Sequence, residues 1–284
     1  MSVSEKNWDI TIRPKSGLFE LNLKELWRYR DLLIMLVRRD FVSFYKQTIL
    51  GPIWFLMQPI LTTAMFLFLF TRIAKMPTDG APPVLFILAG VICWSYFSES
   101  LTKTSDTFIA NANIFGKVYF PRLIIPMSIV LSNMIRLGIQ LGLFFVVLAY
   151  YVFVKGIDVH FTWAVWLFPV LILMMGLLGL GLGVIFSSLT TKYRDLRFLL
   201  TFGISLLQFA VPVAYPLSSV SAEHRWIIVA NPFTAIIETF RYGFLGCGEF
   251  NPGYFLYSCC AILLILLIGI LIFNRVEKTF MDSV

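Results

Sequence analysis

RDLLIMLVRRDFVSFYKQTILGPIWFLMQP, residues 30–59, changes its character halfway along. In the first half, apolar residues recur at helical spacing, and an arc of about 120° around the helix axis carries no charge. The arc holds Leu33, Ile34, Val37, Phe41, Phe44, Tyr45 and Thr48. The charged residues lie outside it, together with the apolar residues Leu32, Met35, Leu36 and Val42. Such a helix typically lies in the headgroup layer of a membrane, with its basic side toward anionic lipid or a protein partner.

The second half of this stretch has the composition of a membrane span. No charge occurs from Gln47 to Thr71, and the Gly51-Pro52 pair marks a corner in the chain. We therefore expect a helix on the membrane surface that leads directly into a helix through the membrane.

The composition of the whole chain indicates an integral membrane protein. A soluble protein carries roughly a quarter charged residues, whereas only 14% of these 284 residues are charged and 58% are apolar. The net charge of +7 is interpreted as basic residues kept on the cytoplasmic side of a bilayer, so we expect no nucleic-acid partner. Metal-ligand spacing is absent among the cysteines and histidines, and we expect no metal site and inert thiols. These residues are Cys93, Cys247, Cys259, Cys260, His160 and His224.

Stretches without charge predict six spans, because about 20 apolar residues are needed to cross about 30 Å of hydrocarbon. The predicted spans are Gln47–Thr71, Gly80–Ser98, Leu123–Val154, His160–Lys192, Phe198–Ala222 and Phe250–Asn274. The fifth of them is expected to be broken by Pro212 and Pro216.

A shorter apolar segment precedes the last span. Trp226–Ile237 has twelve uncharged residues and is interrupted by Asn231 and Pro232. Twelve residues are too few for a helical span, so we expect a re-entrant or interfacial helical hairpin over residues 226–245, which also contains Glu238 and Arg241. The alternative is a single span from Trp226 to Leu245.

The lysines and arginines of the short connections set the orientation. Twelve of them fall on the side of the N-terminus and five on the other side, so we expect both termini in the cytoplasm. The predicted fold class is an all-α integral membrane protein. Its expected parts are a flexible tail (1–24), an amphipathic interface helix (25–48), a six-span domain (49–274) and a cytoplasmic tail (275–284).

Glycines spaced by four residues predict close packing between helices. The two pairs are Gly138/Gly142 in the third span and Gly179/Gly183 in the fourth. The alternative for either pair is the ordinary enrichment of glycine in membrane helices.

The sequence contains no nucleotide-binding motif that could power transport. The segment Gly116-Lys117-Val118 lacks the leading glycine and the hydroxyl residue of a phosphate-binding loop, so any energy for transport must come from a partner. Two cytoplasmic features could receive it, the amphipathic helix and the loop 111–122; the alternative for the loop is that it lies against lipid. The candidate coupling residues are Arg38, Arg39, Asp40, Lys46, Asn111, Asn113, Ile114, Phe115, Lys117, Phe120 and Arg122.

Three blocks in order resemble the membrane subunit of ABC-2-type polysaccharide exporters. They are YRDLLIMLVRRDFVSFYKQTILGPIWFLMQP (29–59), ANIFGKVYFPRLIIP (112–126) and ANPFTAIIETFRYGFLG (230–246), and the similarity extends over about residues 20–280. The resemblance implies a homodimer of six-span subunits in the bacterial inner membrane that exports lipid-linked O-antigen, capsule or teichoic-acid chains. It implies that Trp226–Leu245 forms a periplasmic re-entrant helix pair before the last span. It also implies two copies of a separate cytoplasmic ATPase, which binds ATP and magnesium and contacts Asp31–Thr48 and Asn111–Arg122.

A path for a glycan requires aromatic faces and neutral hydrogen-bonding groups. Arg136 is unusual, because a charge inside a span normally faces a polar interior or pairs with a partner such as Glu99; snorkelling to the interface is the alternative. For the aromatic residues, the alternative is packing against lipid or other helices. The candidate path residues are Trp94, Tyr96, Phe97, Glu99, Asn133, Arg136, Gln140, Gln208 and Tyr215.

Three other functions stay open at this point. The first is an ABC-2 exporter of a drug or a lipid. The second is a membrane enzyme that transfers sugar or phosphate, for which Glu223, His224 and Arg225 form the only compact polar group. The third is a proton-coupled transporter, for which Glu99 is the only nearby buried carboxylate candidate.

Overall fold

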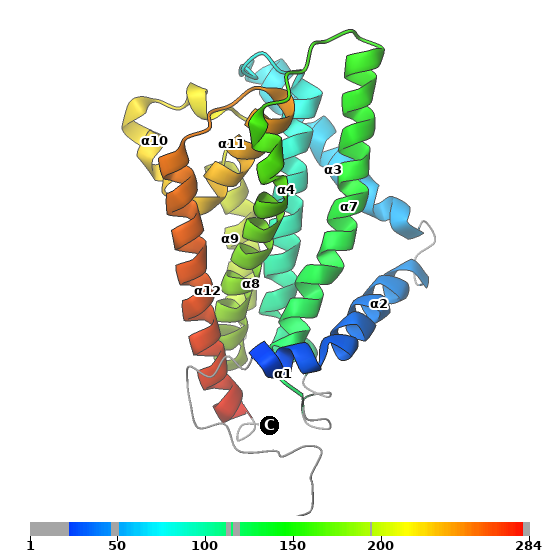
Figure 1. Cartoon of the computed structure of the whole chain (residues 1–284). Helices are drawn as coiled ribbons and strands as arrows, with labels where there is room; N and C mark the ends of the chain where they lie inside the picture. The colour runs from blue at the N-terminus through cyan, green and yellow to red at the C-terminus, as the bar shows by residue number, and fades with distance from the viewer. Residues whose placement is uncertain (1–22, 47–50, 112–114, 116–119, 194, 281–284) are drawn as a thin grey trace, which may run out of the picture.

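A computed structural model describes residues 23–46, 51–111, 115, 120–193 and 195–280. In this part of the chain all regular structure is helical, and Figure 1 shows the long helices side by side as a bundle. The chain enters the bundle through the short helix α1 (Leu23–Arg28) and the oblique helix α2 (Arg30–Lys46). The elements that follow are η1 (Gly51–Ile53), α3 (Trp54–Phe66), η2 (Leu67–Ile73), α4 (Pro83–Ser105), α5 (Thr107–Ala110), α7 (Ile124–Phe153), η3 (Trp163–Leu167), α8 (Phe168–Lys192), α9 (Leu196–Ala210), η4 (Leu217–Ser219), α10 (Ala222–Val229), α11 (Pro232–Leu245) and α12 (Pro252–Phe280).

Five helical segments in the described part are long and apolar enough to cross a membrane. They are Trp54–Ile73, Pro83–Ser105, Ile124–Phe153, Trp163–Lys192 and Pro252–Val276. Each overlaps one of the six predicted spans, because the charges at both ends of an apolar run mark where the chain leaves the hydrocarbon.

The remaining predicted span, Phe198–Ala222, is helical in its first part and breaks at the two prolines, as expected. Helix α9 has 15 residues and ends at Ala210. Beyond it, Val211–Pro216 is not helical, because Pro212 and Pro216 cannot donate the backbone hydrogen bonds that a helix needs.

The segment before α12 forms two helices. Helix α10 ends at Val229, and α11 begins at Pro232 with the Asn231 side-chain oxygen accepting a hydrogen bond from the Phe233 N–H at 3.0 Å. This break excludes the single helix from Trp226 to Leu245. Figure 1 shows α10 at the end of the bundle opposite α1 and the last turns of α12.

Small residues bring α8 against α4, as predicted for one of the two glycine pairs. A Cβ added at Gly183 would lie 2.5 Å from the Thr104 Cβ, and one added at Gly179 would lie 2.9 Å from the Ser100 Cβ. Around Gly138 and Gly142 no atom lies within 4 Å of an added Cβ. The prediction of close packing is therefore wrong for the α7 pair within the described protomer.

Candidate functional site

One ionic cluster joins α3, α4 and α7. Arg136 Nη1 and Lys103 Nζ lie 2.9 Å and 3.0 Å from the same oxygen, Glu99 Oε1, and Arg136 Nη2 donates to Gln58 Oε1 at 2.6 Å. The cluster is partly open, since the Arg136 and Glu99 side chains are 15% and 29% exposed. The pairing with Glu99, left open by the sequence, is therefore formed.

Two members of this cluster were missed in the sequence. Lys103 lies one helical turn after Glu99 on α4, a spacing that favours an ion pair, so the sequence held a signal for it. Gln58 lies 78 residues from Arg136 along the chain, and only the fold brings the two together.

The neutral candidates on α7 join helices together. Gln140 Nε2 donates to the Phe55 carbonyl at 3.1 Å, and its side-chain oxygen accepts from Ser95 Oγ at 2.8 Å. Asn133 Nδ2 donates to Ser100 Oγ at 3.2 Å. Because Gln140 and Asn133 are buried, they hold α7 to α3 and α4 and offer no open group to a substrate in this protomer.

The predicted aromatic lining lies in the core. Trp94, Tyr96 and Phe97 are all buried. The Trp94 and Phe97 rings pack with the Phe233 ring of α11 at centroid distances of 5.5 Å and 4.8 Å. The expectation that these three residues line an open path does not hold for the described protomer, because helix packing covers them.

The two candidates beside the α9 break differ in setting. Gln208 is half-buried near the end of α9. The Tyr215 hydroxyl donates to the Phe209 carbonyl at 3.2 Å and so folds the segment back onto α9.

A second ionic cluster, around Arg241 of α11, is closed. The Arg241 side chain is fully buried, and Glu238 Oε1 lies 3.5 Å from its Nη1. Its guanidinium donates to the carbonyls of Pro212 at 2.7 Å and Val213 at 2.6 Å, and Nε donates to Phe86 at 3.2 Å. Here the main partners of the arginine are backbone oxygens.

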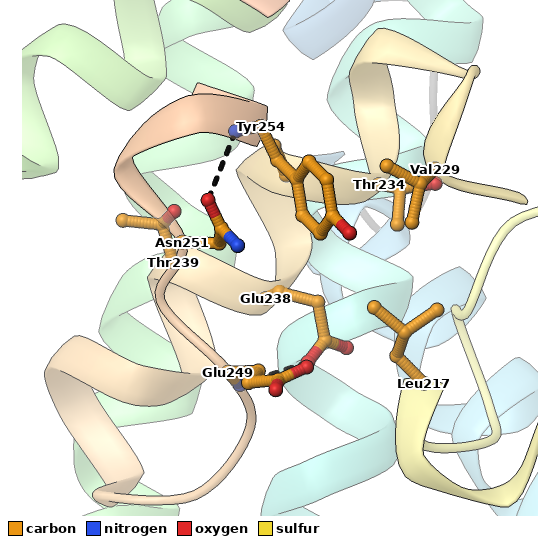
Figure 2. A pocket seen from close by; sticks show the side chains of 9 residues that line it. Leu217, Val229, Thr234, Glu238, Thr239, Glu249, Asn251 and Tyr254 are labelled. Carbon is orange, nitrogen blue, oxygen red and sulfur yellow. Dashed lines mark hydrogen bonds between the residues drawn. The ribbon is translucent and has the colours of Figure 1, made fainter. Parts of the chain in front are cut away.

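A small pocket lies beside Glu238, between α11, η4 and the start of α12. Figure 2 shows Glu238 reaching the backbone of Glu249, whose N–H donates to Glu238 Oε2 at 3.2 Å. In the same view the Asn251 side-chain oxygen accepts from the Tyr254 N–H at 3.3 Å and so caps α12. Glu249 also forms an ion pair with Arg225 of α10. These contacts connect α10, α11 and α12 at one end of the bundle.

Helix α2 packs on the bundle around a residue that lies outside the charge-free arc. Leu36, which lies outside the charge-free arc, is buried in a cluster with Phe115, Phe120 and Phe273, whereas Ile34 inside the arc is 62% exposed. Helix α2 lies against α7, and the orientation of the charge-free arc toward lipid stays a prediction. Of the coupling candidates on α2, Arg38, Arg39 and Lys46 are exposed, and Arg39 Nη2 pairs with Asp40 at 2.8 Å.

The described part of the loop 111–122 is largely packed inside. Phe115, Phe120 and Arg122 are buried, and the Arg122 guanidinium lies over the Phe115 ring at 5.5 Å. Phe115 and Phe120 pack in one cluster with Leu36 of α2 and Phe273 of α12, and the coupling role of these three residues stays a prediction. Asn111 is half-buried and donates to the Thr107 carbonyl at 3.0 Å; Asn113, Ile114 and Lys117 lie outside the described residues.

An ion pair ties the same end of α4 to α9. Arg197 Nη2 lies 2.8 Å from Asp106 Oδ2. Partial burial raises the pKa of the Asp106 carboxyl above its ordinary value, and the positive charge of Arg197 offsets part of this increase.

The ABC-2 type transporter family matches residues 31–245, from α2 through α11, and so includes both ionic clusters. The chain belongs to the ABC-2 type transporter family. Its members are transport subunits that normally work with a cytoplasmic ATPase, and this ABC-2 permease is accordingly a multi-pass protein of the inner membrane.

Relatives of this ABC-2 permease include named polysaccharide exporters. The O-antigen export system permease protein RfbA of Klebsiella pneumoniae is 29% identical over 89% of this chain and 94% of its own length. RfbA of Myxococcus xanthus is 29% identical over 77% and 82%, respectively. The polysialic acid transport protein KpsM of Escherichia coli is 22% identical over 82% and 89%.

Proposed function

We propose that this ABC-2 permease exports lipid-linked polysaccharide of the O-antigen, capsule or teichoic-acid type across the inner membrane. Two copies form the passage, and each docks on a separate cytoplasmic ATPase that binds ATP and magnesium. The polysaccharide export permeases among its relatives support this substrate class over a drug or a free lipid.

The observation that carries the proposal is the open ionic cluster of Glu99, Lys103, Arg136 and Gln58. A charged group within a span is costly against hydrocarbon and normally faces a polar space or a partner. Because Arg136 and Glu99 keep part of their surface open, this face of α3, α4 and α7 turns toward a hydrated passage or toward the second copy. Neutral and charged hydrogen-bonding groups there provide contacts for sugar hydroxyl groups.

Coupling to the ATPase is assigned to the exposed basic side of α2. Arg38, Arg39 and Lys46 point away from the bundle, while the opposite face of α2 packs in one apolar cluster with Phe115, Phe120 and Phe273. A push on α2 is thereby passed through this cluster to Phe115 and Phe120, to the start of α7 and to α12.

The sixth crossing is assigned to α9 together with Val211–Pro216. Helix α9 alone has 15 residues, too few to span about 30 Å as a helix, and the non-helical segment supplies the remaining length. An even number of crossings puts α1 and the end of α12 on one side, which the positive-inside bias makes the cytoplasm. Helices α10 and α11 then form the periplasmic re-entrant pair.

The test is deletion of the gene with complementation in its own host. We expect loss of surface polysaccharide and accumulation of the lipid-linked glycan inside the cell, both restored by the wild-type chain and not by Arg136→Gln made at equal level. Unchanged surface polysaccharide together with increased drug sensitivity or altered lipid export would contradict the assignment.

A further inference from the structure

Arg241 is bound mainly by the backbone of a chain segment that has no helical hydrogen bonds. Beyond the end of α9, the carbonyls of Pro212 and Val213 accept from the two terminal nitrogens of Arg241 at 2.7 Å and 2.6 Å, and the Tyr215 carbonyl lies 3.5 Å from Nη1. Backbone carbonyls at membrane depth are tolerated only when something inside the protein satisfies them. The guanidinium supplies those missing donors.

The other side of the guanidinium is seated on α4. Nε donates to the Phe86 carbonyl at 3.2 Å, and the group lies 3.6 Å from the centroid of the Phe86 ring, a cation–π contact. One helical turn later, the missing side chain of Gly90 leaves room for the Val213 carbonyl and the guanidinium. A Cβ added at Gly90 would overlap the Val213 carbonyl oxygen and lie 2.8 Å from Arg241 Nη2. A single side chain thus holds α4, α11 and the segment 212–215 together.

Further hydrogen bonds attach neighbouring loops to these three elements. Glu238 balances the charge of Arg241 and accepts from the Glu249 N–H at 3.2 Å, which attaches the loop before α12. Ser218 Oγ of η4 donates to Asp79 Oδ1 at 2.7 Å, which attaches the connection between η2 and α4.

A buried charge is an expensive way to hold a core together, and apolar residues of similar volume stabilise as well or better. The planar fork of arginine is suited to a different task, because it binds several acceptors in a fixed geometry that the single ammonium group of lysine cannot reproduce. The contacts of Arg241 therefore fix a position, in addition to contributing stability.

We propose that Arg241 is a positioning residue for transport: it fixes the segment 212–215 to α4 and α11, and these parts stay together as one rigid block throughout the export cycle. The proposal rests on the proposed function for its link to transport, whereas the rigid block itself is a property of the chain that can be measured without a glycan. It follows that any opening of the periplasmic end occurs around this block and not through it.

The first experiment measures the access of a membrane-impermeant maleimide to Ala214→Cys in inside-out and right-side-out membranes. The four native cysteines are replaced by alanine, and the permease is expressed with its ATPase. Ala214 is buried and Ala222 at the start of α10 is exposed, so we expect Ala214→Cys to react at least tenfold more slowly than Ala222→Cys, with and without ATP turnover. Labelling of Ala214→Cys that increases to the Ala222→Cys rate during turnover would overturn the rigid block.

The second experiment adds Arg241→Lys, with Arg225→Lys as the matched control. Arg225 lies nearby on α10 in a surface ion pair with Glu249. Only protein that is extracted as a folded, monodisperse species is compared. We expect Arg241→Lys to accelerate Ala214→Cys labelling at least tenfold and to reduce glycan export at least tenfold while ATP hydrolysis stays within twofold. Arg225→Lys should change none of these quantities by more than twofold.

The outcomes separate the two claims. Unchanged labelling and export in folded Arg241→Lys would overturn the positioning role, because charge alone would then suffice. A second outcome is accelerated labelling in Arg241→Lys while even the wild-type permease exports no glycan. This outcome would support the rigid block and would contradict the proposed substrate. If Arg241→Lys yields no folded protein, the labelling of Ala214→Cys in the Arg241 background still decides whether the block stays closed.

Discussion

Two arginine–glutamate pairs in the same bundle have opposite surroundings. Arg136 and Glu99 lie on different helices, keep part of their surface open and share their contacts with the side chains of Lys103 and Gln58. Arg241 and Glu238 lie one turn apart on α11, are sealed from solvent, and bind mostly backbone groups. The Arg136–Glu99 pair thus lies on a face that stays accessible, whereas the Arg241–Glu238 pair holds a chain segment in a fixed position.

This difference has an energetic consequence. Removing one partner of a sealed pair leaves a buried charge and unpaired carbonyls, whereas a partly open pair can be replaced in part by water and neighbouring groups. Truncation of a side chain in the closed cluster is therefore expected to act first on folding, whereas variants at the open cluster are expected to act on transport in a protein that still folds.

The largest effect is expected for Arg241→Ala. It removes the donors of three carbonyls and leaves Glu238 without its counter-charge, which destabilises the folded protein by about 3–5 kcal/mol. The measurement is the amount of monodisperse protein after extraction and its thermal midpoint. A midpoint equal to that of the wild type would show that the closed cluster does not hold the segment 212–215.

A somewhat smaller loss is expected for Gly90→Ala. The added methyl group would overlap the Val213 carbonyl oxygen and crowd Arg241, a type of overpacking that costs about 1–3 kcal/mol. Gly138→Ala on α7 is the matched control, because no atom lies within 4 Å of its added Cβ. Equal thermal midpoints for the two variants would contradict the tight seat on α4.

For Arg136→Gln, the expected loss of stability is about 1–2 kcal/mol, from hydrogen bonds to charged groups, and the protein still folds. Glycan export should fall at least tenfold at equal protein level. Arg136→Lys is the comparison that keeps the charge. Normal export by Arg136→Gln would contradict the claim that the open cluster is part of the passage.

The smallest effect is expected for Lys103→Gln. Its ammonium group is half exposed and forms a one-turn ion pair with Glu99, which contributes less than about 1 kcal/mol. Thermal midpoint and export should both stay close to wild type, and export should change less than in Arg136→Gln. A greater loss of export than in Arg136→Gln would show that lysine is the main cation of the open cluster.

The sequence predicted the helical spans well and their mutual contacts poorly. Gaps between charges marked the five long spans, because charge is expelled from hydrocarbon whatever the fold. Arg136 inside one span and Glu99 at the end of another raised their pairing as one possibility, beside a place along the passage and snorkelling to the interface. The break at Pro212 and Pro216 was predicted, but the last helical residue, Ala210, was not, because the charge-free stretch continues past both prolines.

Contacts between distant segments were beyond sequence reasoning. The carbonyl partners of Arg241 lie 29 and 155 residues away from it along the chain, and no local spacing connects them. Trp94 and Phe97 were expected at the passage, but whether an aromatic residue of a hydrophobic helix faces a path or the core depends on which helix covers it, here α11 with Phe233.

The most direct test of the open cluster as part of the passage is site-specific photocrosslinking at Gln58. A photoreactive residue is placed there and, as a control on an apolar exposed surface, at Val170 of α8, in cells that make the lipid-linked polysaccharide. The account predicts that the residue at position 58 captures glycan during ATP turnover and that the residue at position 170 captures only phospholipid. Capture of phospholipid alone at both positions would contradict it.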